Sequence, residues 1–285
     1  MRVLVTGGSG FIGTHLVNRL IEKGHEVRVL DNKAPQNRKA RYVNGDIRSV
    51  EDVSIAMSGC KACFHLAAIA QARNEDKDLL YKVNYLGSKT VFDAAEKVGA
   101  KIIFASSSAV YGNVAKPAKE TAQCNSVSYY GTTKLKSEQL LKGSDAFIVR
   151  LFNVYGPGNE AGVVNVFCKR MMNYQEVPVI GNGRQTRDFV YVSDVVDALF
   201  LGIEHNGIYN VGTGKETSVL QLIEIIQRLA RYKPNIVRVE ASPLDPEKSV
   251  ADITKITKLG WKPKIELQKG IRLVLENYGE KFAHV

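Results

Sequence analysis

A tyrosine and a lysine are spaced for general-base chemistry in the segment Tyr130-Gly131-Thr132-Thr133-Lys134. On a helix this spacing brings both side chains to one face. A lysine charge beside a phenol favours the phenolate and lowers a pKa that is normally about 10. Tyr130 is therefore a candidate base at neutral pH. Because such pairs also occur on ordinary helix surfaces, the pair gains meaning only beside other chemical groups.

Hydroxyl groups follow a predicted buried strand in Ser106-Ser107-Ser108, directly after the apolar run at 101–105. Ligands of doubly wound sheets bind at the carboxyl ends of strands. These serines are therefore candidate partners for a substrate oxygen. A polar turn at the end of the strand is the structural alternative.

Glycines at positions 7, 10 and 13 separate an apolar run at 2–6 from a helical pattern that reaches Gly24. A strand, a glycine turn and a helix in this order present backbone N–H groups and a positive helix end to a pyrophosphate. Asp31 ends the next strand pattern, where a carboxylate accepts hydrogen bonds from a ribose diol and repels a 2′-phosphate. The pattern predicts NAD rather than NADP, and a tight turn without a ligand is the alternative.

The elements that must position these groups alternate along the first half of the chain. Strands are predicted at 2–6, 27–31, 63–67, 101–105 and 147–151, with helices at 79–98 and 130–141. This alternation predicts an α/β fold, a Rossmann-type doubly wound parallel sheet. A smaller C-terminal mixed α/β substrate region follows, with helices at 192–204, 219–231 and 267–278. The expected division is 1–152 for the NAD-binding domain, with a soft boundary, and 153–285 mainly for the second region, with a sheet-like segment at 208–211 that can rejoin the first domain.

Composition and charge limit the class of protein. The chain has 285 residues, of which 45% are hydrophobic and 24% charged, which is typical of a globular protein. No apolar run approaches the ~18 residues of a membrane span, so a cytoplasmic protein without membrane contact is expected. The net charge of +10 favours nucleic acids, anionic surfaces or phosphorylated small molecules as partners.

The spacing Cys60-Lys61-Ala62-Cys63 invites a metal or redox interpretation. A zinc site needs a second pair of ligands, and Cys124 and Cys168 are isolated. We therefore expect buried structural thiols and no metal. His65 is likewise expected to pack at the end of its strand.

Five motifs in this order resemble the extended short-chain dehydrogenase/reductase family, and within it the nucleotide-sugar 4-epimerases that act on UDP-glucose and UDP-N-acetylglucosamine. They are Thr6–Gly13, His65-Leu66-Ala67-Ala68, Ser106–Gly112, Tyr130–Lys134 and Arg187–Val192. The resemblance extends over nearly the whole chain. It implies NAD as cofactor, a UDP-sugar as substrate, a homodimer, and C4 epimerisation through a transient 4-keto sugar.

The resemblance also implies a role for individual residues. Tyr130 corresponds to the base, Lys134 to its partner and a cofactor ligand, and Ser107 to the polar catalytic residue. The implied cofactor-binding residues are Gly7, Gly10, Phe11, Ile12, Gly13, Asp31, Asn32, Asp46, Ile47, Leu66, Ala67, Ala68, Asn84, Tyr130 and Lys134. The implied substrate-binding residues are Ser107, Ser108, Tyr130, Asn153, Val164, Arg187, Asp245 and Ser249.

The sequence departs from its relatives at sites that affect specificity. The segment Ser242-Pro243-Leu244-Asp245 lacks the arginine that relatives use on the nucleotide diphosphate. Ser108 and Ala109 replace the Asp-Glu pair of the related 4,6-dehydratases, which argues against elimination. Ser249 occupies the position that gates the sugar C2 substituent, and its small side chain predicts that N-acetylhexosamines are accepted as well as plain hexoses.

Two alternative functions remain at this point. A nucleotide-sugar reductase or a decarboxylating dehydrogenase would use the same fold. A non-catalytic dinucleotide sensor or nucleic-acid-binding protein would use the Rossmann domain and the positive charge, but the basic residues are scattered and no basic run is interleaved with aromatic residues. We therefore expect a phosphorylated small molecule and no nucleic acid. The sugar, the nucleotide base and the residue that replaces the missing arginine are left open.

Overall fold

The chain forms two compact units, each assembled from separate segments. The computed structural model describes residues 1–70, 76–114, 116–240 and 246–282. Unit 1 comprises Met1–Gly112, Glu120–Leu151 and Val195–Asn210, and unit 2 comprises Asn113–Lys119, Phe152–Asp194 and Val211–Val285. The chain passes between the units several times, and residues 195–210, which include most of the segment expected to rejoin the first domain, belong to unit 1. Residues 195–210 lie with unit 1 because a helix and a strand of this segment cover and extend its sheet.

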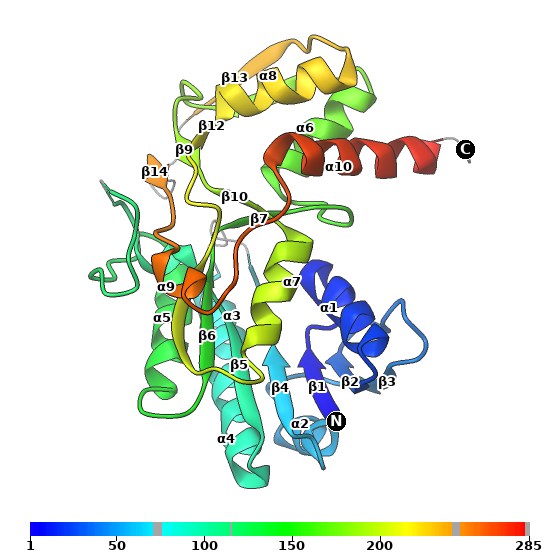
Figure 1. Cartoon of the computed structure of the whole chain (residues 1–285), viewed down its shortest axis with the longest axis vertical. Coiled ribbons are helices and arrows are strands. Elements are labelled where there is room, and N and C mark those ends of the chain that lie inside the picture. Colours follow the sequence, from blue (N-terminus) through cyan, green and yellow to red (C-terminus); the bar gives the residue numbers. More distant parts are fainter. Residues whose placement is uncertain (71–75, 115, 241–245, 283–285) are drawn as a thin grey trace. The chain divides into compact units, whose positions relative to one another are not determined.

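A seven-stranded sheet in the order β11-β6-β5-β4-β1-β2-β3 forms the centre of unit 1 (Figure 1). Its strands are β1 (Arg2–Thr6), β2 (Glu26–Asp31), β3 (Arg41–Asn44), β4 (Ala62–His65), β5 (Lys101–Ser107), β6 (Phe147–Leu151) and β11 (Gly207–Val211). The pairings from β3 across to β6 are parallel. The predicted Rossmann-type α/β fold is confirmed, and β11 includes the segment at 208–211. The strand order reverses between β1 and β4, where doubly wound sheets bind ligands.

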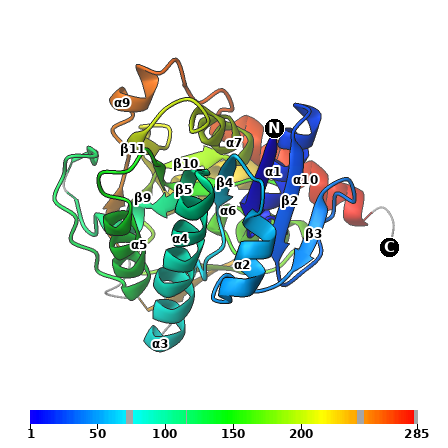
Figure 2. The same ribbon diagram turned by 90° about the horizontal axis from the view of Figure 1, so that it is seen from below.

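Helices cover both faces of this sheet. They are α1 (Phe11–Glu22), α2 (Val50–Met57), α3 (Lys77–Leu80), the π-helix η1 (Tyr81–Gly87), α4 (Ser88–Val98), the 3-10 helix η2 (Ser108–Val110), α5 (Tyr129–Leu140) and α7 (Val192–Leu201), of which residues 195–201 belong to unit 1. Figure 2 shows α2, α4 and α5 on one face and α1 with α7 on the other. The single helix predicted at 79–98 is thus interrupted by a π-helical turn, a feature often found at functional sites.

Alternate side chains of the central strands enter two apolar layers. Leu4, Cys63 and Phe104 belong to a buried cluster shared with α2 and α4. On the other face, the ring centroid of Phe64 lies 6.3 Å from that of Phe200 on α7. A parallel sheet buried on both faces explains why its strands are continuous apolar runs in the sequence.

The burial predicted for the two cysteines of the Cys60–Cys63 segment is confirmed. Cys60 and Cys63 are buried and free, and Cys168 is also a buried free thiol. Burial raises the pKa of the Cys63 thiol well above its usual value, so the thiolate is disfavoured there.

Unit 2 is built from short strands and helices. Its strands are β7 (Asn153–Tyr155), β8 (Val177–Ile180), β9 (Thr186–Arg187), β10 (Phe189–Tyr191), β12 (Thr217–Ser218), β13 (Ile236–Val239) and β14 (Lys248–Ser249). They form three small sheets, β10-β7, β12-β9-β14 and β13-β8. Its helices are α6 (Val163–Met172), α8 (Val219–Ala230), α9 (Thr254–Thr257) and α10 (Leu267–Phe282). The helices α6, α8 and α10 pack on one another.

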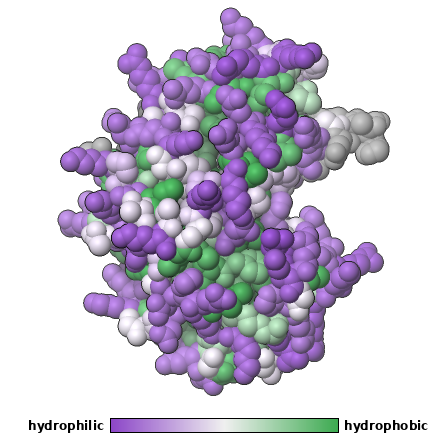
Figure 3. All heavy atoms as spheres, viewed as in Figure 1, coloured by the Kyte–Doolittle hydropathy of each residue, from purple (hydrophilic) through white to green (hydrophobic). Residues whose placement is uncertain are grey.

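Hydrophilic residues are distributed over the surface of the protein in Figure 3 rather than gathered in one patch of the viewed face. Figure 3 shows hydrophilic side chains spread over the viewed face, with apolar atoms between them. Within the described ranges, none of the helices combines the length and the apolar character that crossing a bilayer requires.

Candidate active site

The turn between β1 and α1 leaves no room for side chains at two of its glycines. Gly7 has φ +70°, and a Cβ there would lie 2.7 Å from the backbone nitrogen of Ala67. A Cβ on Gly13 would overlap the carbonyl oxygen of Gly7. Gly10 caps α1 without a side-chain hydrogen bond, and the first turn of α1 carries no acidic residue. The positive end of the helix is therefore available to a phosphate group.

A cavity of about 480 Å³ opens beside this turn in unit 1. It is lined by residues at or after the carboxyl ends of β1 to β4 and by one residue of η1: Gly7, Ser9, Gly10, Asp31, Asn32, Lys33, Gly45, Asp46, Ile47, Arg48, Leu66, Ala67, Ala68, Ile69 and, on η1, Val83. Nine of them were predicted as cofactor-binding residues. Six further lining residues were not predicted: Ser9, Lys33, Gly45, Arg48, Ile69 and Val83. Each lies within two residues of a predicted cofactor-binding residue, so proximity in the sequence could have indicated them. Phe11, Ile12 and Gly13 form the first turn of α1 beside the cavity.

The carboxylates of the cavity are held in place by nearby groups. Asp31 accepts hydrogen bonds from the backbone N–H groups of Ser9 (3.0 Å) and Lys33 (3.1 Å). Because each carboxylate oxygen has a second lone pair, Asp31 still has capacity for a ribose diol. The Arg48 guanidinium hydrogen-bonds Asp46 and lowers the pKa of that carboxyl. The Asp31 carboxylate suits a ribose diol and the open end of α1 suits a pyrophosphate, so the cavity fits a dinucleotide.

Asn84 forms hydrogen bonds with the backbone of Ile69, a residue that lines the cavity. Its fully buried amide accepts from the backbone N–H of Ile69 (2.8 Å) and donates to the Ile69 carbonyl (3.1 Å) and to Thr133 Oγ1 (3.3 Å). Asn84 therefore positions Ile69, which lines the cavity. Its own contact with a cofactor stays a prediction.

His65 is a packing residue, as expected. Its ring nitrogens lie 2.7 Å from Thr6 Oγ1 and 2.9 Å from Ser88 Oγ, and its ring stacks on Phe104. Burial and the charge of Lys134 lower its pKa to about 3, so it is neutral at physiological pH.

Ser107 and Tyr130 meet at the carboxyl end of β5. The Ser107 hydroxyl accepts from the Ala109 backbone N–H (3.2 Å) and lies near enough to the Tyr130 phenol to act on its pKa. Burial raises the pKa of Tyr130, and the nearby Ser107 hydroxyl opposes this shift. The net direction is opposite to the lowering that we predicted from Lys134, because the loss of hydration outweighs the other effects.

Lys134 is buried on the same helix as Tyr130, with 2% of its surface exposed. Its Nζ lies 4.3 Å from the centroid of the Phe104 ring. Burial lowers its pKa to about 7, while the charge of Glu138 acts in the opposite direction. Lys134 therefore exchanges its proton near neutral pH, which suits a group that assists a base.

The short strands of unit 2 bring three predicted substrate residues together. Ser249 of β14 pairs in register with Arg187 of β9, and Asn153 donates its backbone N–H to the Asp188 carbonyl (3.0 Å). The buried Asp188 carboxylate accepts from Thr213, from the Gly214 N–H and from the Ala251 N–H. We did not predict this role for Asp188. Its signal is a charged residue between strand residues in the motif that starts at Arg187.

The remaining predicted substrate residues differ in position. Ser108 begins η2 and is partly exposed. Val164 is buried in the first turn of α6, so its side chain packs inside unit 2. Asp245, like Ser242, lies outside the described residues.

Comparison with known proteins identifies the family. Residues 3–212 match the NAD dependent epimerase/dehydratase family. The chain belongs to this family. A Methanocaldococcus jannaschii protein, whose provisional name is UDP-glucose 4-epimerase, is 38% identical over 96% of this chain and 97% of its own. The crystal structure of Thermotoga maritima UDP-glucose 4-epimerase with UDP-glucose has a TM-score of 0.95 at 36% identity, covering 99% of this chain and 100% of that one. The Thermus thermophilus UDP-glucose 4-epimerase complex with NAD has a TM-score of 0.92 at 35% identity, covering 98% and 99%.

Family membership confirms the predicted family and its cofactor, NAD. The glycine turn, the open helix end and Asp31 fit this dinucleotide. The family contains more than one chemistry: UDP-glucuronic acid decarboxylase 2 of Arabidopsis thaliana is 32% identical over 99% of this chain and 69% of its own. The protein is therefore an enzyme of the NAD-dependent epimerase/dehydratase family, and its reaction must be argued from the site.

Proposed function

We propose that this enzyme interconverts UDP-hexoses at C4 and that it accepts UDP-N-acetylhexosamines as well as UDP-glucose and UDP-galactose. The observation that carries the proposal is that Ser107 ends a strand beside Tyr130, with the buried Lys134 on the helix of Tyr130, in the unit that contains the glycine-lined cavity. A hydroxyl, a phenol and an ammonium are the groups that a reversible alcohol oxidation needs. The named epimerases among the relatives support this substrate class.

The residues divide the work between proton transfer and binding. NAD, held by the glycine turn and Asp31, supplies reversible acceptance of a hydride. Tyr130 takes the O4 proton and later returns it, while Ser107 hydrogen-bonds O4 and orients it. Lys134 supports the phenolate with its charge. In unit 2, Arg187 suits the diphosphate, because a guanidinium matches phosphate oxygens with two parallel hydrogen bonds.

The proposal is tested by incubating the purified protein with UDP-, GDP- and dTDP-hexoses without added cofactor and separating the products. We expect the C4 epimer to form from UDP-sugars, with no net change in absorbance from reduced cofactor. Stoichiometric formation or consumption of reduced cofactor would instead identify a reductase or a dehydrogenase.

Decarboxylation is the second candidate, because UDP-glucuronic acid decarboxylases are also close relatives. It predicts release of carbon dioxide from UDP-glucuronate and a pentose nucleotide as product. The same panel therefore includes UDP-glucuronate. Epimerisation without release of carbon dioxide excludes this alternative.

Arg187→Met should raise KM for the UDP-sugar by about tenfold or more, while kcat changes less. Charge-assisted bonds to phosphate contribute about 1.5–3 kcal/mol each, and Arg187 is assigned to binding rather than to the proton transfer. Steady-state kinetics check this result. Arg184→Met is the matched control, because Arg184 is an exposed neighbour whose backbone N–H donates to Asn182. Equal KM values in the two variants would remove Arg187 from the binding role.

Ser249→Tyr should reduce kcat/KM for UDP-N-acetylglucosamine by at least about tenfold and leave UDP-glucose within about twofold. Ser249 is small and buried beside Arg187, and a phenol at this position would fill the space expected for the N-acetyl group. The ratio of the two kcat/KM values measures the effect, with UDP-glucose as the internal control. A parallel loss on both sugars would contradict the gating role.

A further inference from the structure

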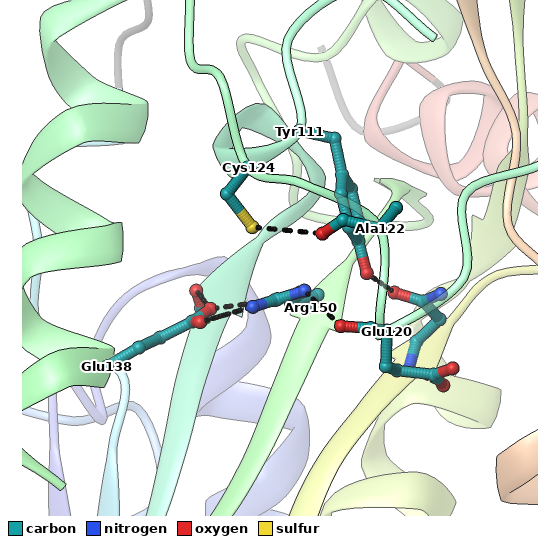
Figure 4. Close-up of polar contacts among 8 residues, drawn as sticks. Tyr111, Glu120, Ala122, Cys124, Glu138 and Arg150 are labelled. Carbon is teal, nitrogen blue, oxygen red and sulfur yellow. Dashed lines mark hydrogen bonds and ion pairs between the residues drawn. The ribbon is translucent and has the colours of Figure 1, made fainter. Parts of the chain in front are cut away.

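A buried ion pair lies behind the Ser107–Tyr130 site. Arg150 and Glu138 are 4% and 5% exposed, and Arg150 Nη2 donates to Glu138 Oε2 at 2.6 Å. Figure 4 shows the guanidinium between this carboxylate and the Glu120 carbonyl, to which it donates at 3.2 Å. It also lies 4.8 Å from the centroid of the Tyr111 ring. The Cys124 thiol faces this group from its loop, and burial raises its pKa, so it stays neutral.

The Glu138 carboxylate joins three elements. Ser106 Oγ on β5 donates to Glu138 Oε1 at 2.5 Å, and Arg150 is the residue of β6 that pairs in register with Ser106. Ser106 directly precedes Ser107. One carboxylate on α5 is thus bonded to two adjacent strands at the point where the first of them presents its catalytic hydroxyl.

Glu138 also shares a helix face with the catalytic pair. It follows Lys134 by four residues and Tyr130 by eight on α5, so the three side chains lie on successive turns of one face. Among the groups around Lys134, the imidazole of His65 is neutral and Phe104 offers only its ring. The carboxylate of Glu138 is the negative charge that raises the pKa of Lys134 against the effect of burial.

Titratable groups on three other helices that pack on α5 contact residues other than Lys134. On α4, Lys89 Nζ pairs with Asp93 Oδ2 at 2.6 Å. On η1, Tyr81 and Tyr85 lie against Lys136, whose Nζ is 5.4 Å and 5.8 Å from their ring centroids. On α3, Lys77 Nζ lies 6.0 Å from the ring centroid of Tyr129. These contacts leave Glu138 as the main charge with which Lys134 interacts.

Stability alone is a weak explanation for this arrangement. Replacing a buried ion pair by apolar residues of similar size is often neutral or stabilising, because burying two charges costs much of what their attraction gains. A carboxylate that bonds to two strands and shares a helix face with a buried ammonium has a use that an apolar pair lacks.

We propose that Glu138 is a positioning residue for the reaction: it fixes the strand of Ser107 against the helix of Tyr130 and Lys134, and it places a negative charge on the helix face of Lys134. This inference rests on the proposed function, in which these three residues carry the chemistry. It adds that their geometry and charge depend on a group that touches neither substrate nor cofactor.

The first test measures the protonation of Lys134 directly, in protein labelled at lysine ¹³Cε, by NMR titration with Lys134→Met for assignment. We expect a midpoint of about 7 in the native protein. In Glu138→Gln the midpoint should fall by about one unit or more, because the amide keeps the shape and loses the charge. The alkaline limb of the activity profile should move to lower pH by the same amount, since protonated Lys134 is then lost earlier. An unchanged midpoint would overturn the proposal.

The second test separates geometry from charge. Ser106→Ala keeps both ions, so the Lys134 midpoint should stay near its native value while kcat falls about tenfold and KM changes little. Ser137→Ala is the matched control: Ser137 is equally buried on α5, but its hydroxyl donates to the backbone carbonyls of Asn84 (2.9 Å) and Thr133 (3.0 Å). Equal kcat values in these two variants would refute the positioning role.

Two further measurements keep the outcomes distinct. If Glu138→Gln does not fold because Arg150 is left unpaired, the double variant Glu138→Gln/Arg150→Gln removes both charges, and it must also lower the Lys134 midpoint. The titration needs no substrate. A shifted midpoint in a protein without epimerase activity would therefore reject the proposed function alone, whereas full activity with an unshifted midpoint would reject this inference alone.

Discussion

Replacing Tyr130 by phenylalanine should abolish epimerisation while the protein stays folded and keeps NAD. The substitution removes only the hydroxyl of a half-buried ring beside Ser107. Without this hydroxyl, Tyr130 can no longer take the O4 proton, and the barrier to oxidation at C4 rises. A positioned base contributes about 10²–10⁴-fold to a rate, so we expect kcat to fall by about a thousandfold. Product formation from UDP-glucose, together with NAD content measured after denaturation, checks both parts of the result.

Tyr129→Phe is the matched control for this prediction. Tyr129 is the neighbouring tyrosine on α5, and its ring faces Lys77 rather than Ser107. We expect it to keep activity within about twofold of the native enzyme. A Tyr130→Phe enzyme that retained a tenth of the native rate would show that another group takes the O4 proton.

The pH dependence of the native enzyme follows from the same residues. Because burial raises the pKa of Tyr130, the phenolate fraction increases as the pH rises above neutrality. Lys134, with a pKa of about 7, loses its charge over the lower part of that range. The two groups therefore oppose each other, and their coupling rather than either pKa alone sets the optimum.

Most of the central sheet was predictable because its signal is local, whereas the edge strand β3, which has no buried residue, was not predicted. Strands such as β1 and β6 are short, largely apolar runs, and their observed bounds coincide with the predicted ones. The π-helical turn η1 was not predictable, because its sequence continues the apolar pattern of a helix. It is associated with a contact distant in sequence, the bond from Asn84 to Thr133.

The residues of the site also divide into those that the sequence could predict and those that it could not. The residues around the glycine turn follow from one βα motif and its neighbouring strand ends, which the sequence presents in order. The group formed by Ser106, Glu138 and Arg150 does not, because each comes from a different element. Its one local sign is a charged residue at position 150 in an apolar strand, which must find a partner when it is buried. The raised pKa of Tyr130 was also not predictable, because it results from burial of the phenol and not from the sequence spacing of Tyr130 and Lys134.

Gly13→Ala should destabilise unit 1 and abolish NAD binding, although alanine is the better helix former. Gly13 lies in the first turn of α1, and a Cβ would overlap the Gly7 carbonyl and come within 2.7 Å of the Gly8 Cα. Both contacts are with backbone, so α1 must move away from β1. Overpacking of this kind costs about 1–3 kcal/mol, and the displaced helix end no longer meets the pyrophosphate. Thermal unfolding and NAD titration measure the two effects.

Gly279→Ala is the same substitution in another helix, and we expect it to stabilise the protein rather than destabilise it. Gly279 also lies inside a helix, α10, but a Cβ there meets nothing within 4 Å. With no clash to oppose it, the smaller entropy of the unfolded chain should stabilise this variant by about 0.4–1 kcal/mol. NAD binding should be unchanged. If both variants shifted the unfolding temperature in the same direction, the close approach of α1 to the glycine turn would not be the reason for glycine at position 13.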